Sequence, residues 1–249
     1  MSVDDAFPAF HYRPGRRRDL LILCDHASNR IPPALGGLGL DAAARASHIA
    51  WDPGAAGIAR QLAERLRCPA FFGAASRLLV DLNRAPDAAD LIVAHNDGRA
   101  VPGNVDLDAA ARAQRLDIHF HPYHAAITRH LDACARRGRS PILIAIHTFS
   151  PEMDGQRRPW PIGLVWKQAD PANQRLLDWF RAGGIDIGDN QPYGASAMGY
   201  TLNRHGIGRG LRHLMFEVRQ DLVSEAGGQR DWARRILAAL RAAGVGRPA

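Results

Sequence analysis

The chain has 249 residues, of which 46% are apolar and 23% charged, and its formal net charge is +7. This composition suits one globular domain, and the absence of any period among its glycines and prolines excludes a solenoid or a low-complexity tail. The first 20 residues lack the apolar core of a signal peptide, and no run approaches the roughly 20 apolar residues of a membrane span. We therefore expect a cytoplasmic protein with no membrane partner.

The positive charge comes mostly from arginines, which cluster tightly only at 16–18 and otherwise lie on expected helical faces such as 233–244. No recognition-helix, RNP or zinc-finger pattern accompanies them, so we expect no nucleic-acid partner. A basic site for a small anionic ligand explains the charge equally well. The three cysteines, Cys24, Cys68 and Cys134, are too few and too distant for a disulfide framework or a cysteine zinc motif, and we expect buried thiols.

A single domain over 1–249 is expected, with residues 1–17 as an N-terminal extension. In chain order the apolar patterns then predict a strand over 20–24, a helix over 53–66, a strand over 78–82, one helix over 106–138 or two that break near Pro122, strands over 142–146 and 162–166, a helix over 173–183, a strand over 214–218 and a helix over 229–244. Apolar strands that alternate with helices indicate an α/β fold whose mostly parallel sheet is covered on both faces.

Polar residues follow several of these strands at the end where ligands gather in such folds. Asp25 and His26 follow the first strand, Asn83 and Arg84 follow the second, His147 follows the third, and Glu217 lies in the last. Any one of them alone would be an ordinary capping or structural group. Together they indicate a functional site at one edge of the sheet.

The two strand-end histidines, His26 and His147, suggest a shared metal ion, because imidazole is a good zinc ligand and both rings are carried by rigid strands. A catalytic zinc takes three protein ligands. The candidates for the third are Asp52, Asn29, Asp25 and Glu217. Asp52 is the best carboxylate, although it would also serve as the N-cap of the helix over 53–66. Asp25 is better placed to orient a ligand from behind.

The arginines Arg77 and Arg84 suit a substrate with carboxylates, since guanidinium groups bind them in a bidentate fork. The alternative for Arg84 is a structural ion pair with Asp81 or Asp87. His121 and His124 are expected in structural roles or behind the ligands. The glycine-rich stretch "GYTLNRHGIGRG" at 199–210 offers Arg204 and His205 either as a binding loop or as an ordinary exposed loop.

The ordered motifs "CDHASNRIP", "AWDPGA", "SRLLVDLNR", "HPYH", "AIHTFSP", "GYTLNRHG" and "FEVRQDL" over roughly residues 18–225 resemble the N-formylglutamate amidohydrolase family, also called N-formylglutamate deformylases. That family is similar to the zinc carboxypeptidase-like hydrolases, which include aspartoacylase and succinylglutamate desuccinylase. The resemblance implies a three-layer α/β/α fold around a central, mostly parallel mixed sheet. It also implies one Zn²⁺ per chain and hydrolysis of N-formyl-L-glutamate, a small anionic N-acyl amino acid, to formate and glutamate.

Carried onto this sequence, the resemblance makes His26 and His147 zinc ligands and Glu217 the general base. The usual third ligand, a glutamate three residues after the first histidine, is Asn29 here, so Asp52 is our replacement. The resemblance further assigns the remaining site residues: the substrate-binding pair Asn83 and Arg84, the carbonyl-polarising Arg77, and a substrate loop with Gly199, Tyr200, Arg204 and His205. The alternatives are a hydrolase of another N-acyl amino acid or peptide-like amide, as a desuccinylase, aspartoacylase or carboxypeptidase would be, or a catalytically silent relative that binds a metal or metabolite.

Overall fold

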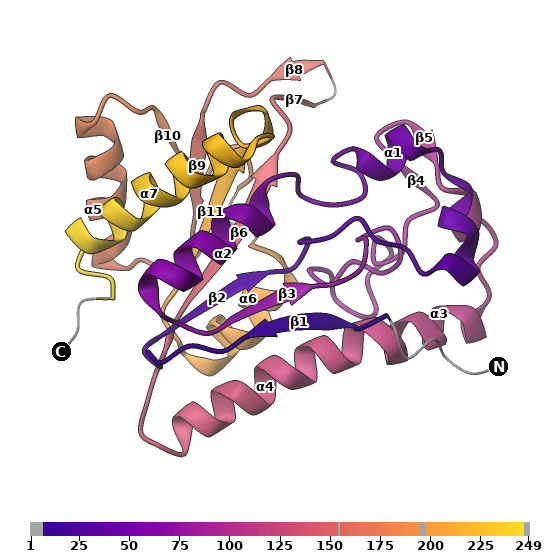
Figure 1. The fold of residues 1–249 in the computed structure, drawn as a ribbon, viewed down its shortest axis with the longest axis horizontal. Helices are drawn as coiled ribbons and strands as arrows, with labels where there is room; N and C mark the ends of the chain where they lie inside the picture. The colour runs from indigo at the N-terminus through magenta and orange to yellow at the C-terminus, as the bar shows by residue number, and fades with distance from the viewer. Residues whose placement is uncertain (1–6, 154, 195–197, 247–249) are drawn as a thin grey trace.

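The computed structural model describes residues 7–153, 155–194 and 198–246, and it is built on a seven-stranded mixed sheet between two layers of helices (Figure 1). The strands lie in the order β1 (Phe10–Arg13), β3 (Ala70–Gly73), β2 (Leu20–Cys24), β6 (Ile142–Phe149), β11 (His213–Arg219), β9 (Ile162–Val165) and β10 (Ile187–Asp189). The central four, β3, β2, β6 and β11, are parallel to one another, whereas β1 and the β9–β10 pair run antiparallel to them. The expected three-layer α/β/α class with a mostly parallel sheet is confirmed.

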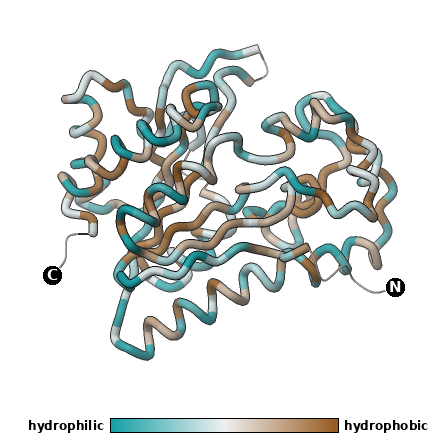
Figure 2. Tube along the Cα trace, viewed as in Figure 1, coloured by the Kyte–Doolittle hydropathy of each residue, from teal (hydrophilic) through white to brown (hydrophobic). Residues whose placement is uncertain are grey.

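Both faces of the sheet are buried, which explains why its strands are apolar at consecutive positions. In β2, Leu20 and Ile22 pack into one core, and Leu21 and Leu23 pack into the other. The first core is covered by α2 (Ala55–Leu66), α5 (Pro171–Ala182) and α7 (Ala226–Ala242), and the second by α4 (His121–Ala135) and α6 (Gly199–His205). Figure 2 shows the hydrophobic residues concentrated along the central strands and hydrophilic residues on the outer helices.

The remaining elements are short and lie largely around one end of the sheet. They are α1 (Ala42–Ala46), α3 (Ala109–Arg115), the hairpin of β4 (His95–Asn96) and β5 (Arg99–Ala100), the hairpin of β7 (Glu152–Met153) and β8 (Gln156–Arg157), and 3-10 segments at Pro33–Gly39, Pro102–Asn104, Ile207–Arg209 and Gln220–Leu222. Aspartates cap several helices, as their sequence positions favour. The side chains of Asp41, Asp108 and Asp170 accept hydrogen bonds from the first turns of α1, α3 and α5.

The stretch over 106–138 forms α3, a π-helical segment at Leu116–Phe120 and α4 in direct succession. The expected break near Pro122 therefore takes the form of a π-helical segment just before it. Pro122 itself lies in the first turn of α4, where its missing N–H is tolerated. Gly138 follows α4 with φ +65°, in agreement with its expected role in ending the helix.

The expected strand over 78–82 is wrong. These residues form turns, in which the Leu79 amide donates to the Ser76 carbonyl and the Asp81 amide donates to the Leu91 carbonyl. Their apolar side chains are nevertheless buried, Leu78 and Leu79 in a small core around α1 and Val80 in the core under α4. Burial without strand pairing produces the same apolar run, whereas the true strand β3 offers only three apolar residues before Gly73.

Part of the segment expected as an N-terminal extension belongs to the sheet. Phe10–Arg13 pairs antiparallel with β3 as the edge strand β1, while residues 1–6 lie outside the described residues. Among the described residues, no helix combines the length and the apolar character that crossing a membrane requires.

Candidate functional site

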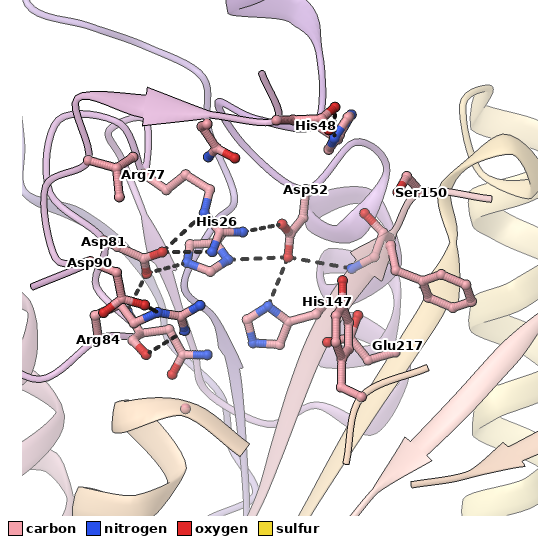
Figure 3. Close-up of a pocket in the computed structure, with 18 of the residues that line it drawn as sticks. His26, His48, Asp52, Arg77, Asp81, Arg84, Asp90, His147, Ser150 and Glu217 are labelled. Atoms are coloured by element: carbon pink, nitrogen blue, oxygen red, sulfur yellow. Dashed lines mark hydrogen bonds and ion pairs between the residues drawn. The ribbon is translucent and has the colours of Figure 1, made fainter. Parts of the chain in front are cut away.

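The site lies at the carboxyl ends of β2, β6 and β11, on the face of the sheet that α4 and α6 cover (Figure 3). His26 follows β2 by two residues, and His147 lies near the end of β6. His147 is paired in register with Glu217 of β11, so the two side chains project from neighbouring strands to the same face. This arrangement places a potential ligand and a potential base side by side on two paired strands within the sheet.

A cavity of about 590 Å³ opens over this edge of the sheet. Most of the expected site residues line it, together with several residues that no sequence pattern had indicated. The expected residues that line it are His26, Asp52, Arg77, Asn83, Arg84, His147, Gly199, Tyr200 and Glu217, and the others include His48, Asp81, Asp90, Phe149, Ser150, Arg158 and Tyr193.

His26, Asp52 and His147 converge within the cavity and could hold a metal ion, since one ligand atom from each lies within 4.8 Å of the others. Asp52 Oδ2 lies 2.8 Å from His147 Nδ1 and 3.4 Å from His26 Nδ1. All three side chains are buried. Asn29 takes no part, because its side-chain amide donates to the carbonyl of Arg45. Of the candidates for a third ligand, Asp52 is thus the one that meets both histidines.

Asp52 is not the N-cap of the following helix, as the sequence had allowed. Gly54 is the residue before α2, with φ +85°, and the Asp52 side chain is turned towards the histidines instead. The backbone holds it there, because the Asp52 amide donates to the His26 carbonyl at 3.0 Å and the Asp52 carbonyl accepts from Ala55 at 3.1 Å. The carboxylate is therefore free of the helix and available to the site.

Each histidine has a second carboxylate on its other ring nitrogen. His26 Nε2 lies 2.7 Å from Asp81 Oδ1, and His147 Nε2 lies 3.5 Å from Asp25 Oδ2. Asp25 Oδ1 in turn accepts hydrogen bonds from the hydroxyls of Tyr123 at 2.6 Å and Thr201 at 3.0 Å. Asp25 thus lies behind a histidine, as expected. The site roles of Asp81, Tyr123 and Thr201 were not predicted from the sequence.

The charges of this cluster shift one another's pKa values. Burial alone would raise the pKa of Asp52, but the neighbouring His26 and His147 outweigh it and hold that pKa below its usual range. Burial likewise opposes a proton on His147, yet its contacts with the carboxylates of Asp25 and Asp52 raise its pKa well above the ordinary value. Carboxylates that favour a proton on these rings also favour a cation between them.

Glu217 behaves differently from the other carboxylates. It is buried and makes no ion pair among the described residues, and its Oε2 atom has no hydrogen-bond partner there. Burial raises its pKa to about 7, against the opposing effect of the charge of His147. A carboxylate with this pKa can both accept and release a proton near neutral pH, which is what a general acid–base group requires.

Two of the arginines that line the cavity, Arg77 and Arg84, are already engaged with carboxylates. Arg77 donates to Asp81 Oδ2 at 2.7 Å and reaches Asp52 Oδ1 at 3.4 Å. Arg84 pairs with Asp90 at 2.6 Å rather than with Asp81 or Asp87, and this pair is largely exposed. The ion pair expected as an alternative for Arg84 therefore exists with a different partner, at the rim of the cavity.

Asn83 and helix α6 are tied together. The Asn83 side-chain oxygen accepts from the Thr201 amide at 3.0 Å, and the Tyr200 amide donates to the Asn83 carbonyl at 3.0 Å. Gly199, at the start of α6, has φ +75° and lies so close that a Cβ there would overlap the Asn83 side chain. Tyr200 and Asn83 consequently share one wall of the cavity.

Arg204 and His205 do not reach the cavity. The Arg204 guanidinium donates to the Tyr200 hydroxyl at 2.6 Å on the outer side, facing a separate hollow of about 370 Å³. His205 is fully buried under α4, with Nε2 at 3.1 Å from His124 Nδ1. His124 contacts the Leu82 carbonyl through its other nitrogen at 3.0 Å, and His121 lies on the exposed face of α4. The two histidines His124 and His205 support the loop that carries Asn83.

Comparison with known proteins agrees with this architecture. A search of curated proteins finds no match. Among solved structures, a gene product of Agrobacterium tumefaciens is 30% identical with a TM-score of 0.90, over 95% of this chain and 94% of that one. An N-formylglutamate amidohydrolase from Ralstonia eutropha JMP134 is 17% identical with a TM-score of 0.69, over 96% of this chain and 97% of that one, and shares the fold.

The sequence model of the N-formylglutamate amidohydrolase family matches residues 18–224, the span that holds the strands, the convergent histidines and Glu217. The family and the arrangement of the site agree on an enzyme that hydrolyses amides. The chain belongs to the N-formylglutamate amidohydrolase family.

Proposed function

We propose that this protein is a zinc-dependent amidohydrolase that cleaves the amide of an N-formyl or N-acyl acidic amino acid, with N-formyl-L-glutamate as the leading substrate and formate and glutamate as products. The observation that carries the proposal is the convergence of His26, Asp52 and His147 next to the unpaired, buried carboxyl of Glu217. The family membership of the chain supports the same reaction class.

The residues present fit a zinc ion. Two imidazole nitrogens and one carboxylate oxygen are donors that zinc prefers, and three protein ligands are the usual number at a catalytic site. Each histidine is backed by a second carboxylate, Asp81 or Asp25, as zinc-binding histidines commonly are. When bound, the ion supplies a Lewis acid that polarises the amide carbonyl and lowers the pKa of water.

Glu217 would move the proton. It accepts a proton from water while the water oxygen bonds to the carbonyl carbon, and it then gives that proton to the amide nitrogen as the C–N bond breaks. Both transfers occur within the reach of one carboxyl group whose pKa, about 7 through burial, matches neutral conditions. The proton balance closes on formic acid and the free amino group, and the acid then ionises.

The basic residues would bind and polarise the substrate. Arg77 keeps one side exposed to the cavity while Asp81 fixes its guanidinium, so it can stabilise negative charge on the carbonyl oxygen. Asn83 and Arg84 would hold a carboxylate of the substrate at the rim. Because Arg84 already pairs with Asp90, it can share only part of its guanidinium with the substrate.

The first experiment separates the metal from the chemistry. Glu217→Gln should keep about one zinc per chain, because the three ligand residues are unchanged, while formate release falls about 10²–10⁴-fold. The double variant His26→Ala/His147→Ala should lose the zinc. Elemental analysis and a formate assay measure the two effects. A Glu217→Gln enzyme that turns over near the wild-type rate would remove Glu217 from the mechanism.

A panel of N-acyl substrates tests which acyl group the enzyme removes. The cavity volume of about 590 Å³ accommodates more than a formyl group, so N-acetyl, N-succinyl and peptide-like amides belong in the panel. Faster turnover of a larger acyl group would assign the protein to a desuccinylase- or carboxypeptidase-like activity. Zinc binding without turnover of any amide would instead indicate a silent binding relative.

A further inference from the structure

Arg158, which follows strand β8, lines the cavity and carries a charge that no described carboxylate neutralises. Its guanidinium makes no ion pair among residues 7–153, 155–194 and 198–246. Its two hydrogen-bond acceptors are neutral, the Tyr193 hydroxyl at 3.2 Å and the Met153 sulfur. A cation in a cavity wall with only neutral partners is available to an anionic ligand.

The other two arginines that line the cavity differ from Arg158 in this respect. Arg77 is engaged by Asp81 and Asp52, and Arg84 is engaged by Asp90. The protein's own carboxylates therefore neutralise Arg77 and Arg84. Arg158 is left for the substrate.

The guanidinium of Arg158 is held in place before any ligand arrives. Its central carbon lies 4.9 Å from the ring centre of Tyr193 and 5.9 Å from that of Phe149, both within cation–π range. Its backbone amide donates to the Pro151 carbonyl at 2.8 Å, which ties the strand end to the segment after β6. A side chain stacked in this way loses little rotamer freedom when it binds a ligand.

Tyr193 adds a second donor at the same place. Its hydroxyl oxygen accepts from Arg158, so its own hydrogen remains to be donated into the cavity. Burial raises the pKa of Tyr193 to about 12, which keeps that hydrogen in place at neutral pH. A guanidinium and a phenol side by side match the two oxygens of a carboxylate.

We propose that Arg158 and Tyr193 form an anchor for a substrate carboxylate, across the metal-ligand cluster from the Asn83–Arg84 rim. Figure 3 shows Arg84 and Ser150 on opposite sides of His147. The backbone amide of Arg158 donates a hydrogen bond to the carbonyl of Pro151, the neighbour of Ser150. A substrate with two carboxylates spans the cavity and meets a base at each end. The anchor rests on the proposed function for the reaction, and it adds the two residues that recognise the second acidic group of the substrate.

The test compares ligands that differ only in one charge. N-formyl-L-glutamate and N-formyl-L-glutamine are titrated calorimetrically into the zinc-loaded Glu217→Gln protein, in which turnover is suppressed. We expect Arg158→Met to weaken glutamate-derivative binding by about 10- to 100-fold and glutamine-derivative binding by less than about threefold. Tyr193→Phe should show the same selectivity with a smaller loss, and Arg158→Lys should recover part of the affinity.

Arg157→Met is the matched control, because Arg157 precedes Arg158 on the same hairpin, is exposed and does not line the cavity. It should bind both ligands like its parent. Equal losses for both ligands in Arg158→Met, no loss for either, or no detectable binding of N-formyl-L-glutamate by the parent would overturn the anchor. Thermal unfolding of each variant shows whether a loss comes from misfolding, and Arg158→Lys repeats the test if Arg158→Met is unfolded.

The binding test and the reaction assay can fail separately. If the wild type releases no formate yet binds N-formyl-L-glutamate through Arg158, the reaction is wrong and the anchor stands. If the wild type hydrolyses N-formyl-L-glutamate and Arg158→Met does so with the same KM, the reaction assignment stands and the anchor is wrong.

Discussion

At the level of single residues, the site is a chain of alternating carboxylates and histidines. The order of contacts is Asp81, His26, Asp52, His147 and Asp25, and Asp52 contacts both histidine rings. The outer carboxylates fix the ring orientations and raise the basicity of the nitrogens that face Asp52. Because these contacts are continuous, we expect a substitution of either outer carboxylate to change the metal affinity of the histidines.

Asp81→Asn tests this coupling. The substitution keeps the shape of the side chain but removes the charge that faces His26 and Arg77, so we expect zinc affinity to fall about 10- to 100-fold. Competition with a chromogenic chelator measures it. Asp90→Asn, which touches only the exposed Arg84, is the control and should keep the parental affinity. Unchanged zinc affinity in Asp81→Asn would show that the outer carboxylate does not tune the site.

The residues that sequence could identify are those whose position on a strand already tells where they lie. His26, His147 and Glu217 are of this kind, since the ends of parallel strands share an edge. Tyr123 is not, because its hydroxyl reaches Asp25 from a helix 98 positions away, and the motif "HPYH" that contains it does not indicate this contact. In the sequence, His205 cannot be told from a binding residue. In the fold it lies on the buried face of α6.

At the level of elements, helix α6 supports the substrate side of the cavity through its contacts with Asn83. Gly199 starts the helix in a conformation that favours glycine, and only the absence of a Cβ leaves room for Asn83.

The apolar run over 78–82 was wrongly predicted as a strand because buried turns and buried strands can share one apolar pattern. Its leucines are buried by tertiary packing around α1, not by sheet pairing, and periodicity cannot tell the two apart.

Gly199→Ala should therefore displace Asn83. We expect KM for N-formyl-L-glutamate to rise about tenfold, as for the loss of one hydrogen bond to a charged group, with a smaller effect on kcat. Gly210→Ala is the control, because Gly210 also has positive φ, +64°, but has open space around its Cβ position. It carries the backbone strain alone. A similar KM in both variants would mean that the Asn83 contact is unimportant for binding.

At the level of the whole molecule, the stability should depend on pH through the buried pair His124 and His205. His124 Nε2 must donate to the Leu82 carbonyl, so its Nδ1 accepts from His205 Nε2 and both rings are neutral. Burial lowers the pKa of His124 to about 4 and that of His205 to about 3. Below the ordinary value of about 6.5, the unfolded chain therefore binds more protons than the folded protein, and the free energy of unfolding falls as pH falls.

Replacement of His205 by glutamine measures this linkage. The amide can still donate to His124 but cannot titrate, so the stability lost between pH 7.5 and 5 should shrink by about 2 kcal/mol, the cost of 1.5 pKa units at pH 5. Urea unfolding at the two pH values gives the difference. His11→Gln, at an exposed position of β1, should leave the loss as in the wild type. An undiminished loss in His205→Gln would show that other groups cause the acid sensitivity.

The class of the fold could be predicted from alternating apolar segments, whereas the directions of the outer strands could not. The β9–β10 pair runs against its neighbour β11, and no pattern within the strands records this. The directions follow from the connections between distant segments, and these are decided when the layers pack.

The in-register pairing of His147 with Glu217 separates chemistry from recognition. Their spacing is the separation of neighbouring strands, about 4.8 Å, and the backbone ladder maintains it. Arg158 and Tyr193 stand instead on connecting segments, which tolerate exchange of sequence far better than sheets do. The β7–β8 hairpin and its flanks could accordingly be grafted from a relative or randomised in a library. Such variants would inherit a working hydrolytic centre and differ in the acids they accept, which makes this scaffold a starting point for directed evolution of amidases.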